Sequence, residues 1–323
     1  MKFRTEVENP KYDFKLNYYD KIFTIGSCFA ENAADYLLKR KINILANPLG
    51  VLYNPISIEN GIKLLAGKIQ ISEDDLIYNQ YEWHSFYHHS DFSSHEKDLL
   101  IEGINKNKNE AISHLSNSEL VVITLGTSFI YKYFKTGKIV SNCHKIPQKE
   151  FEKKRLTISE TVASLKNIVE LLNEINPKTK IIFTVSPVRH WKDGAEENQR
   201  SKSILILSID EIIKNKTNCF YYPSYEMMID DLRDYRFYKD DLLHPTDFAV
   251  EYISNKFVDS IFNDEAKVFM KEAFQIWTSL NHKVRNREST AYKKFTESLK
   301  IRIEEISKKF PKANFDDELY KTR

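Results

Sequence analysis

Cys28 stands where a thiol could act as a nucleophile. It follows Gly26 and Ser27 at the end of an apolar segment, and an amphipathic helical pattern begins near Phe29. This strand–turn–helix layout resembles the nucleophile elbow of acyl-transfer enzymes. The unpaired N–H groups and the positive dipole end of a helix N-terminus favour a thiolate and can bind an oxyanion. The alternative is a small buried cysteine that only packs the strand against the helix.

Asp241 and His244 form a second candidate pair, three residues apart in a loop. Pro245 and Thr246 follow, and both are typical of the start of a helix. At this spacing a carboxylate can orient an imidazole, which can take the proton of a nucleophile. Cys28, His244 and Asp241 could therefore act as nucleophile, general base and orienting acid. A solvated loop with no catalytic role is the alternative for the Asp-x-x-His pair alone.

Further polar side chains follow other predicted strands. His144 lies after the third strand and its hairpin, and Arg189 and His190 lie after the fourth strand. Loops at the carboxyl ends of parallel strands converge, so these side chains could bind a carboxylate, a phosphate or a sugar hydroxyl. A structural ion pair is the alternative for Arg189, and packing beside Trp191 is the alternative for His190.

Four histidines lie within twelve residues of an aromatic-rich segment: His84, His88, His89 and His95. No zinc-type ligand spacing accompanies them. We interpret the segment as a loop that contacts or covers a substrate, and we expect no metal and no cofactor. Asn198, Arg200 and Lys202, in the string EENQRSK, are interpreted as helix-face residues and not as ligand-binding ones.

The elements that must position these residues alternate between strands and helices. Buried strands are predicted at residues 21–25, 42–46, 120–124, 180–185 and 218–222, and helices at residues 30–40, 56–66, 97–115, 157–175 and 196–214. The alternation predicts an α/β fold with a doubly wound, flavodoxin-like parallel sheet and helices on both faces. Gly26, Gly50 and Gly126 lie at or shortly after strand ends, where such sheets build their sites.

Two further parts are expected. Residues 129–142 predict an inserted β-hairpin that turns at Thr136 and Gly137. After Pro245 we expect a helix to about residue 262, and then two Lys/Glu-rich helices near residues 264–284 and 288–309. We therefore divide the chain into a domain of residues 1–262 and a helical C-terminal extension of residues 263–323.

Composition narrows the class of protein. The 323 residues contain 48 Lys+Arg and 46 Asp+Glu, and this balance gives no basic footprint for nucleic acid. Three widely spaced cysteines argue against a disulfide scaffold. The charged opening segment has no signal-peptide core, and prolines interrupt the longest charge-free stretch, residues 42–58. We expect a cytoplasmic protein with no membrane segment and no nucleic-acid partner.

Beyond these features, the chain resembles the GSCFA-domain family, relatives of the SGNH/GDSL hydrolases. The string GSCFA itself spans residues 26–30. Further blocks are similar to those of the family and occur in the same order: NPLGVLYNPISI (47–58), TLGTSFIY (124–131), NCHKIP (142–147), TVSPVRHWKDG (184–194), YPSYEMMIDDLRDYRFY (222–238) and DLLHP (241–245). The resemblance covers roughly residues 1–262.

The resemblance implies an SGNH-type sheet and a residue for each catalytic role. Gly26-Ser27-Cys28 stands in place of the Gly-Asp-Ser of the SGNH pattern, so Cys28 falls on the nucleophile position. His244 falls on the general base and Asp241 on its orienting acid. Gly50 is the best match for the glycine of the middle block, which helps form the oxyanion hole.

Two departures from the pattern leave alternatives open. The nucleophile is a thiol, so Ser27 remains an alternative nucleophile, with Cys28 then only a packing residue. The segment 126–128 reads Gly-Thr-Ser and lacks the asparagine of the Gly-x-Asn-Asp block. Asn54, Asn142 and the backbone N–H of Cys28 are therefore candidate oxyanion donors, because a developing negative oxygen needs fixed donors within reach.

The leading interpretation is an acyl-transfer enzyme without a cofactor. The resemblance favours an esterase that acts on O-acyl groups of a small molecule or a carbohydrate. The same three residues would serve an O-acyltransferase if an alcohol replaced water as the acceptor. A non-catalytic protein that binds a carbohydrate or a partner is the alternative from another class, because fold does not imply function.

Overall fold

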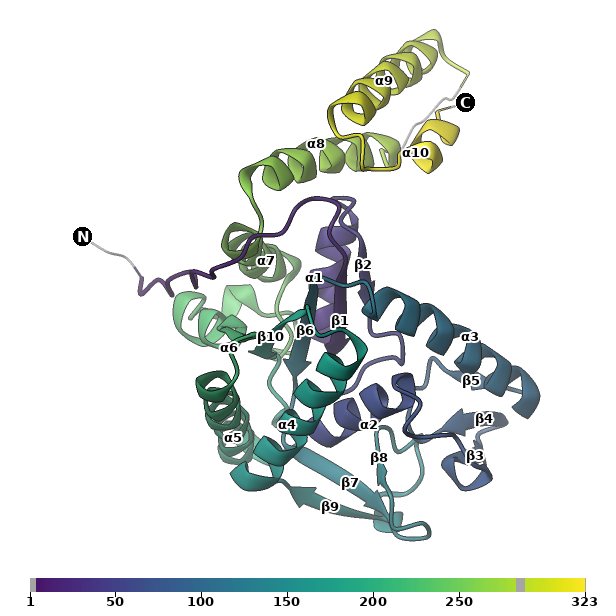
Figure 1. Cartoon of the computed structure of the whole chain (residues 1–323), viewed down its shortest axis with the longest axis vertical. Coiled ribbons are helices and arrows are strands. Elements are labelled where there is room, and N and C mark those ends of the chain that lie inside the picture. The colour runs from purple at the N-terminus through teal and green to yellow at the C-terminus, as the bar shows by residue number, and fades with distance from the viewer. Residues whose placement is uncertain (1–3, 283–287, 323) are drawn as a thin grey trace.

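A five-stranded parallel sheet forms the centre of the computed structural model, which describes residues 4–282 and 288–322 (Figure 1). The strands are β1 (Ile22–Gly26), β2 (Ile44–Ala46), β6 (Leu120–Leu125), β10 (Lys180–Val185) and β11 (Cys219–Tyr222). Their order is β11-β10-β6-β1-β2, and every neighbouring pair is parallel. This order confirms the predicted doubly wound, flavodoxin-like sheet.

Helices cover both faces because each strand sends alternate side chains into two apolar cores. In β1, Ile22 enters one core, while Phe23 and Ile25 enter the other. The first core is covered by α1 (Cys28–Leu38) and α7 (Asp247–Ile261). The second is covered by α2 (Pro55–Leu65), α3 (Lys97–Leu115), α4 (Ile158–Ile175) and α5 (Gly194–Asn215). These bounds agree with the predicted ones to within a few residues.

The carboxyl ends of β1 and β6 mark the point where the chain changes direction across the sheet. The neighbour of β1 on one side is β2, and its neighbour on the other side is β6. Open α/β sheets form their binding crevices at such a point. Because α1 begins directly after β1, the fold brings Cys28 to this position.

Two small antiparallel sheets accompany the central one. The first contains β3 (Leu76–Asn79), β4 (Glu82–Ser85) and β5 (Ser93–Ser94), where the sequence predicts only a loop. The second contains the predicted hairpin as β7 (Phe129–Tyr133) and β8 (Ile139–Val140), with β9 (Phe151–Arg155) as an unexpected third strand. Both lie at the end of the molecule that Figure 1 shows at the bottom.

The two predicted C-terminal helices are present as α8 (Asp264–Leu280) and α9 (Thr290–Lys309), and a short helix that was not predicted, α10 (Asp316–Tyr320), follows them. They extend the first apolar core: the Tyr18 ring centroid lies 4.7 Å from that of Phe269 and 5.2 Å from that of Phe310. Figure 1 shows these helices at the end of α1 away from β7 and β9. The eleven residues of α1 span about 16 Å, so the tail packs at the far end of this helix from Cys28. In the described ranges, no helix has the length and apolarity needed to cross a bilayer.

We expect the contact between the tail and the core to stabilise the whole fold. Phe269 is fully buried between aromatic rings, so Phe269→Ala should lower the free energy of unfolding by about 3 to 5 kcal/mol, measured by urea denaturation. Val268→Ala, its exposed neighbour on α8, is the control and should change stability by no more than about 0.5 kcal/mol. Equal stability of the Phe269→Ala variant and the wild type would show that the tail does not belong to the core.

Candidate active site

The turn between β1 and α1 is held in place by a close approach between the backbones of Gly26 and Thr124. Gly26 has φ +147°, and a Cβ atom there would lie 2.2 Å from the carbonyl oxygen of Thr124. Only glycine fits such a position. The N–H of Ser27 donates to the same Thr124 oxygen at 2.9 Å, and the N–H of Gly26 donates to Oδ1 of Asn47 at 2.8 Å. These contacts fix Cys28 as the first residue of α1.

The surroundings of Cys28 favour the protonated thiol. The side chain is half-buried, and burial followed by the nearby Glu31 carboxylate raises the pKa of the thiol above its ordinary value. Hydrogen bonds from the N–H groups of Cys28 and Phe29, and the positive charge of Lys202, lower this pKa by less. The net shift is opposite to the one expected from the helix N-terminus alone. A resting thiol needs a base to remove its proton before or during an attack.

Ser27, the alternative nucleophile, is much less accessible. The residue is only 1% exposed, and its hydroxyl has no hydrogen-bond partner among the described residues. It is the N-cap of α1 but makes no side-chain capping bond. Since a buried hydroxyl cannot meet a substrate without local rearrangement, Cys28 is the better placed of the two.

Asp241 and His244 are joined in the loop before α7. Nδ1 of His244 lies 2.6 Å from Oδ2 of Asp241. Oδ1 of Asp241 accepts the backbone N–H groups of Leu243 and His244, each at 2.9 Å. The N–H of His244 first, and then that of Leu243, lower the pKa of Asp241 to about 2, so the carboxylate is ionised at neutral pH. An ionised carboxylate at Nδ1 leaves Nε2 of His244 as the atom that can exchange a proton with a substrate or nucleophile.

The thiol and this pair share neighbours but do not touch. Cys28 interacts electrostatically with Tyr53 and Lys202, and His244 interacts with His190. The rings of Tyr53 and His190 meet edge to face, with centroids 5.5 Å apart. Within the described part of the chain, no hydrogen bond joins the Cys28 sulfur to His244. Catalytic hydrogen bonds often tighten only once a substrate is bound.

Lys202 is a buried cation at this site, whereas the sequence pattern suggested only a helix-face residue. Its side chain is fully buried, and Nζ donates to the carbonyl oxygens of Gly126 at 2.7 Å and Ser186 at 2.8 Å. Burial lowers the pKa of Lys202 to about 7. A signal was present: Asn198, Lys202 and Leu205 are spaced as one helix face, and all three are buried. Arg200, by contrast, is exposed.

Arg189 and His190 lie in the loop after β10, as predicted. Burial lowers the pKa of His190 to about 4, so its imidazole is neutral at physiological pH. Its Nε2 atom is buried and has no hydrogen-bond partner among the described residues. The guanidinium of Arg189 stacks on the ring of Trp191, with Cζ 4.5 Å from the centroid.

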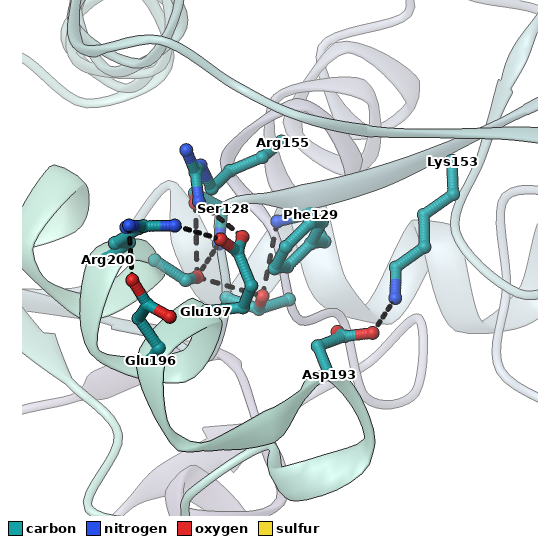
Figure 2. A network of polar contacts seen from close by, with 10 residues as sticks. Ser128, Phe129, Lys153, Arg155, Asp193, Glu196, Glu197 and Arg200 are labelled. Atoms are coloured by element: carbon teal, nitrogen blue, oxygen red, sulfur yellow. Dashed lines mark hydrogen bonds and ion pairs between the residues drawn. The ribbon is translucent and has the colours of Figure 1, made fainter.

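Ion pairs and hydrogen bonds hold this loop and the start of α5 against the small sheet of β7 and β9 (Figure 2). Lys153 pairs with Asp193, and Arg155 pairs with Glu197. The N–H of Ser128 donates to Oγ of Ser201 at 2.7 Å. The small sheet that contains the hairpin therefore supports the segment that carries Arg189 and His190.

The candidate oxyanion donors are placed differently from one another. The N–H of Gly50, at φ +75°, already donates to the carbonyl oxygen of Asn47 at 2.7 Å. Oδ1 of Asn54 caps α2 by accepting the N–H of Ser57 at 2.8 Å. The preceding carbonyl, that of Tyr53, accepts the N–H groups of residues 126 and 127, which brings Asn54 close to the end of β6.

Asn142 and His144 belong to the loop that packs on the first small sheet. The side chain of Asn142 accepts the N–H of His144 at 2.8 Å and donates to Oγ of Ser90 at 3.2 Å. His144 is buried, stacks on His84 at 4.6 Å between centroids and has its pKa lowered by burial to about 4. Among the residues the structure describes, no three His, Cys, Asp or Glu side chains gather as a metal site.

Comparison with known proteins supplies the family. The GSCFA family profile matches residues 21–257, which is most of the chain. The chain belongs to the GSCFA family. The profile of the C-terminal domain of GSCFA domain proteins matches residues 275–323, which contain α9 and α10. The sequence-based assignment to this family is thus confirmed. Among curated proteins, the comparison finds no match.

Solved structures similar to this GSCFA protein include carbohydrate esterases. A carbohydrate esterase family 3 protein from Talaromyces cellulolyticus is 7% identical, with TM-score 0.37, over 78% of this chain and 99% of that one. A family two carbohydrate esterase from Clostridium thermocellum is 13% identical, with TM-score 0.37, over 76% of this chain and 64% of that one. An acetyl xylan esterase from the rumen bacterium Butyrivibrio proteoclasticus is 11% identical, with TM-score 0.39, over the same fractions. This chain thus spans less than two thirds of the last two.

We expect two substitutions near Cys28 of the GSCFA site to shift its titration in opposite directions. Below its own pKa of about 7, Lys202 carries a positive charge that Lys202→Met removes, so the thiol pKa should rise and alkylation by iodoacetamide at pH 6.5 should slow. Glu31→Gln removes a negative charge, so the pKa should fall and alkylation should quicken. The measurement is the pH profile of alkylation at Cys28 by peptide mass spectrometry, with circular dichroism to verify folding. Shifts of the same sign in both variants would contradict this electrostatic account.

Proposed function

We propose that this GSCFA protein is an acyl-transfer enzyme, an esterase of SGNH type, in which Cys28 is the nucleophile. In this proposal His244 is the general base and Asp241 holds its imidazole. The observation that carries it is the 2.6 Å contact between His244 Nδ1 and Asp241 Oδ2, with the same carboxylate held by two backbone N–H groups. Among the described residues, neither side chain of this pair forms a hydrogen bond outside its own loop, and a base is what the resting thiol of Cys28 requires.

The reaction proceeds through a thioester. Nε2 of His244 takes the proton of the Cys28 thiol as the sulfur attacks the ester carbonyl carbon and a C–S bond forms. The tetrahedral intermediate collapses, the C–O bond breaks, and the leaving alkoxide receives the proton from His244. Water then gives a proton to His244 and attacks the thioester carbonyl. The C–S bond breaks, the carboxylic acid leaves, and the sulfur regains its proton.

The negative oxygen of each tetrahedral intermediate needs donors beside Cys28. The N–H groups of Cys28 and Phe29 already hydrogen-bond toward the sulfur and lie in the first turn of α1, where N–H groups lack helical partners. We propose them as the main donors. Asn54, at the start of α2, is the side-chain donor we propose to complete the oxyanion hole. Gly50 then serves the close packing of its loop, because a Cβ there would lie 2.2 Å from Cβ of His89.

We propose an O-acyl ester of a carbohydrate or a small molecule as the substrate, as the family resemblance implies. Water as the acceptor makes the protein a hydrolase, and a sugar alcohol makes it an acyltransferase on the same residues. Three free cysteines agree with a reducing compartment, so we propose the cytoplasm as its location. Residues 263–323 are proposed to be an extension outside the site, since they pack at the far end of α1.

A binding protein is the second candidate. The raised pKa of the Cys28 thiol favours it, because a protonated sulfur is a poor nucleophile. In that case Cys28 would line a ligand site without forming a covalent intermediate, and ligand binding would survive Cys28→Ala.

Intact-protein mass spectrometry after exposure to 4-nitrophenyl acetate tests the nucleophile. We expect a single acetyl adduct on Cys28 that turns over in the wild type, is absent in Cys28→Ala and forms slowly in His244→Ala. Cys143→Ala and Cys219→Ala are the controls and should behave as the wild type, because burial raises the pKa of Cys143 to about 11 and of Cys219 to about 12. Turnover in Cys28→Ala would move the nucleophile elsewhere. No adduct with a range of acyl donors would favour the binding protein.

The orienting role of Asp241 can be tested separately. Asp241→Asn keeps the size of the side chain but removes the charge at Nδ1 of His244, so kcat for the same ester should fall by about 10² to 10⁴. Asp240→Asn, a neighbouring exposed carboxylate, is the control and should leave the rate close to that of the wild type. An equal rate in Asp241→Asn and wild type would remove Asp241 from the catalytic residues.

A further inference from the structure

Arg189 differs from the other arginines that the structure describes. Each of those has a partner for its guanidinium group: Arg4 with Asp231, Arg40 with Glu251, Arg155 with Glu197, Arg200 with Glu196 and Glu197, Arg233 with Asp230, Arg236 with Asp234 and Arg302 with the side-chain amide of Gln275. Arg189 has neither a carboxylate nor a hydrogen-bond acceptor within residues 4–282 and 288–322. Its Nε atom is nevertheless buried.

A half-buried guanidinium without an acceptor is costly. Each buried N–H that loses its hydrogen bonds to water destabilises the protein, and the cost is larger when the group is charged. Stacking on Trp191 supports one face of the group. Stacking leaves the planar edge free, and this edge matches the two oxygens of a carboxylate. The orientation therefore suits an anionic ligand from outside the chain.

Among the described residues, no carboxylate forms an ion pair with Arg189. The groups that interact with it electrostatically include Lys202 and the hydroxyls of Tyr225 and Tyr238. The acidic residues that follow in the chain are already engaged: Asp193 with Lys153, and Glu196 and Glu197 with arginines (Figure 2). The site thus combines two cations, Arg189 and Lys202, neither of which has a carboxylate partner in the described structure.

Position links this charge to the reaction. Arg189 precedes His190, which interacts with His244, and Lys202 interacts with both Arg189 and Cys28. Arg189 therefore belongs to a loop at the carboxyl end of the sheet, and its guanidinium lies within electrostatic range of Lys202.

We propose that Arg189 binds a carboxylate of the substrate, so that the site takes acyl esters that carry a negative charge. This inference rests on the proposed esterase function and narrows its substrate class. The carboxylate could belong to the acyl group or to the alcohol, and in either case the planar guanidinium pairs with its two oxygens. The buried charge of Lys202 adds to the attraction without direct contact.

Two pairs of esters, matched in shape, test the proposal. In the first pair the acyl group carries the charge: the 4-nitrophenyl half ester of glutaric acid is compared with its glutaramate analogue. In the second pair the alcohol carries it: 4-carboxyphenyl acetate is compared with 4-carbamoylphenyl acetate. We expect kcat/KM of the wild type to be about ten- to a hundredfold higher for the carboxylate member of one pair, the usual range for a charge-assisted hydrogen bond. The pair that shows the difference identifies the side of the ester that Arg189 binds.

Variants of Arg189 test whether this residue causes the preference for the carboxylate ester. Arg189→Gln should bring the ratio of kcat/KM for the carboxylate ester to that for the amide ester close to one. Arg189→Lys should retain only part of the preference, because a lysine keeps the charge but cannot donate two parallel hydrogen bonds to a carboxylate. Arg233→Gln removes the same charge from an exposed pair outside the site, and it should keep the wild-type ratio. A wild-type ratio near one for both pairs, or a preference that survives in Arg189→Gln, would overturn the proposal.

A binding measurement separates this proposal from the proposed reaction. If no ester is turned over, the esterase function fails, and Arg189 is tested in Cys28→Ala by titration with sodium glutarate. Since Trp191 stacks on Arg189, we expect a saturable change in tryptophan fluorescence that weakens with added salt and is absent in Arg189→Gln. The assignment of Arg189 as an anion-binding residue would be overturned if Cys28→Ala bound no detectable glutarate. It would also be overturned if Cys28→Ala and the double variant Cys28→Ala/Arg189→Gln bound glutarate equally.

Discussion

The close approach of Gly26 to β6 is the constraint on which the site depends. A Cβ atom at residue 26 would lie only 2.2 Å from the carbonyl oxygen of Thr124, so any residue other than glycine would push β1 and β6 apart. The N–H of Ser27 uses that same oxygen, so the chain leaves the sheet and enters α1 without an intervening loop. The first-turn N–H groups of α1 are consequently delivered to the point where the sheet changes direction, together with the Cys28 sulfur. Neither a strand nor a helix alone would provide this combination of a fixed sulfur and fixed donors.

The buried ammonium of Lys202 is the second constraint, and it acts on the neighbouring strand ends. Its hydrogen bonds to the carbonyls of Gly126 and Ser186 satisfy two acceptors just beyond β6 and β10, where the sheet hydrogen bonds stop. Burial without a carboxylate lowers the pKa of Lys202, while the interaction with Cys28 raises it. By linkage, a negative charge that forms on the sulfur or arrives with a ligand makes this lysine more fully protonated. The positive charge of Lys202 thus increases when a negative charge forms or binds in the site.

Sequence reasoning succeeded where the physical signal was local. β10 and α3 were predicted with the bounds that the structure shows. An apolar β-branched run and a long amphipathic pattern each mark the start and end of their element within the local sequence. The hairpin of β3 and β4 was missed, because its turn places Gln80 and Tyr81 at positive φ where glycine or asparagine is expected. β9 was missed because its exposed edge carries charged side chains and lacks an apolar alternation.

The same distinction applies to the candidate site. Asp241 and His244 are three residues apart, so their contact is a local event that spacing alone could predict. Helical spacing could have indicated that Lys202 is buried, but it could not identify the hydrogen-bond acceptors, because these lie 76 and 16 residues away along the chain and only the packed sheet brings them together. The resting state of the thiol is equally non-local: burial by distant segments outweighs the local effect of the helix N-terminus. That outcome changes the chemistry expected of the site. A preformed thiolate could react without a base, whereas a buried thiol needs one, which is the role we propose for His244 with Nδ1 held by Asp241.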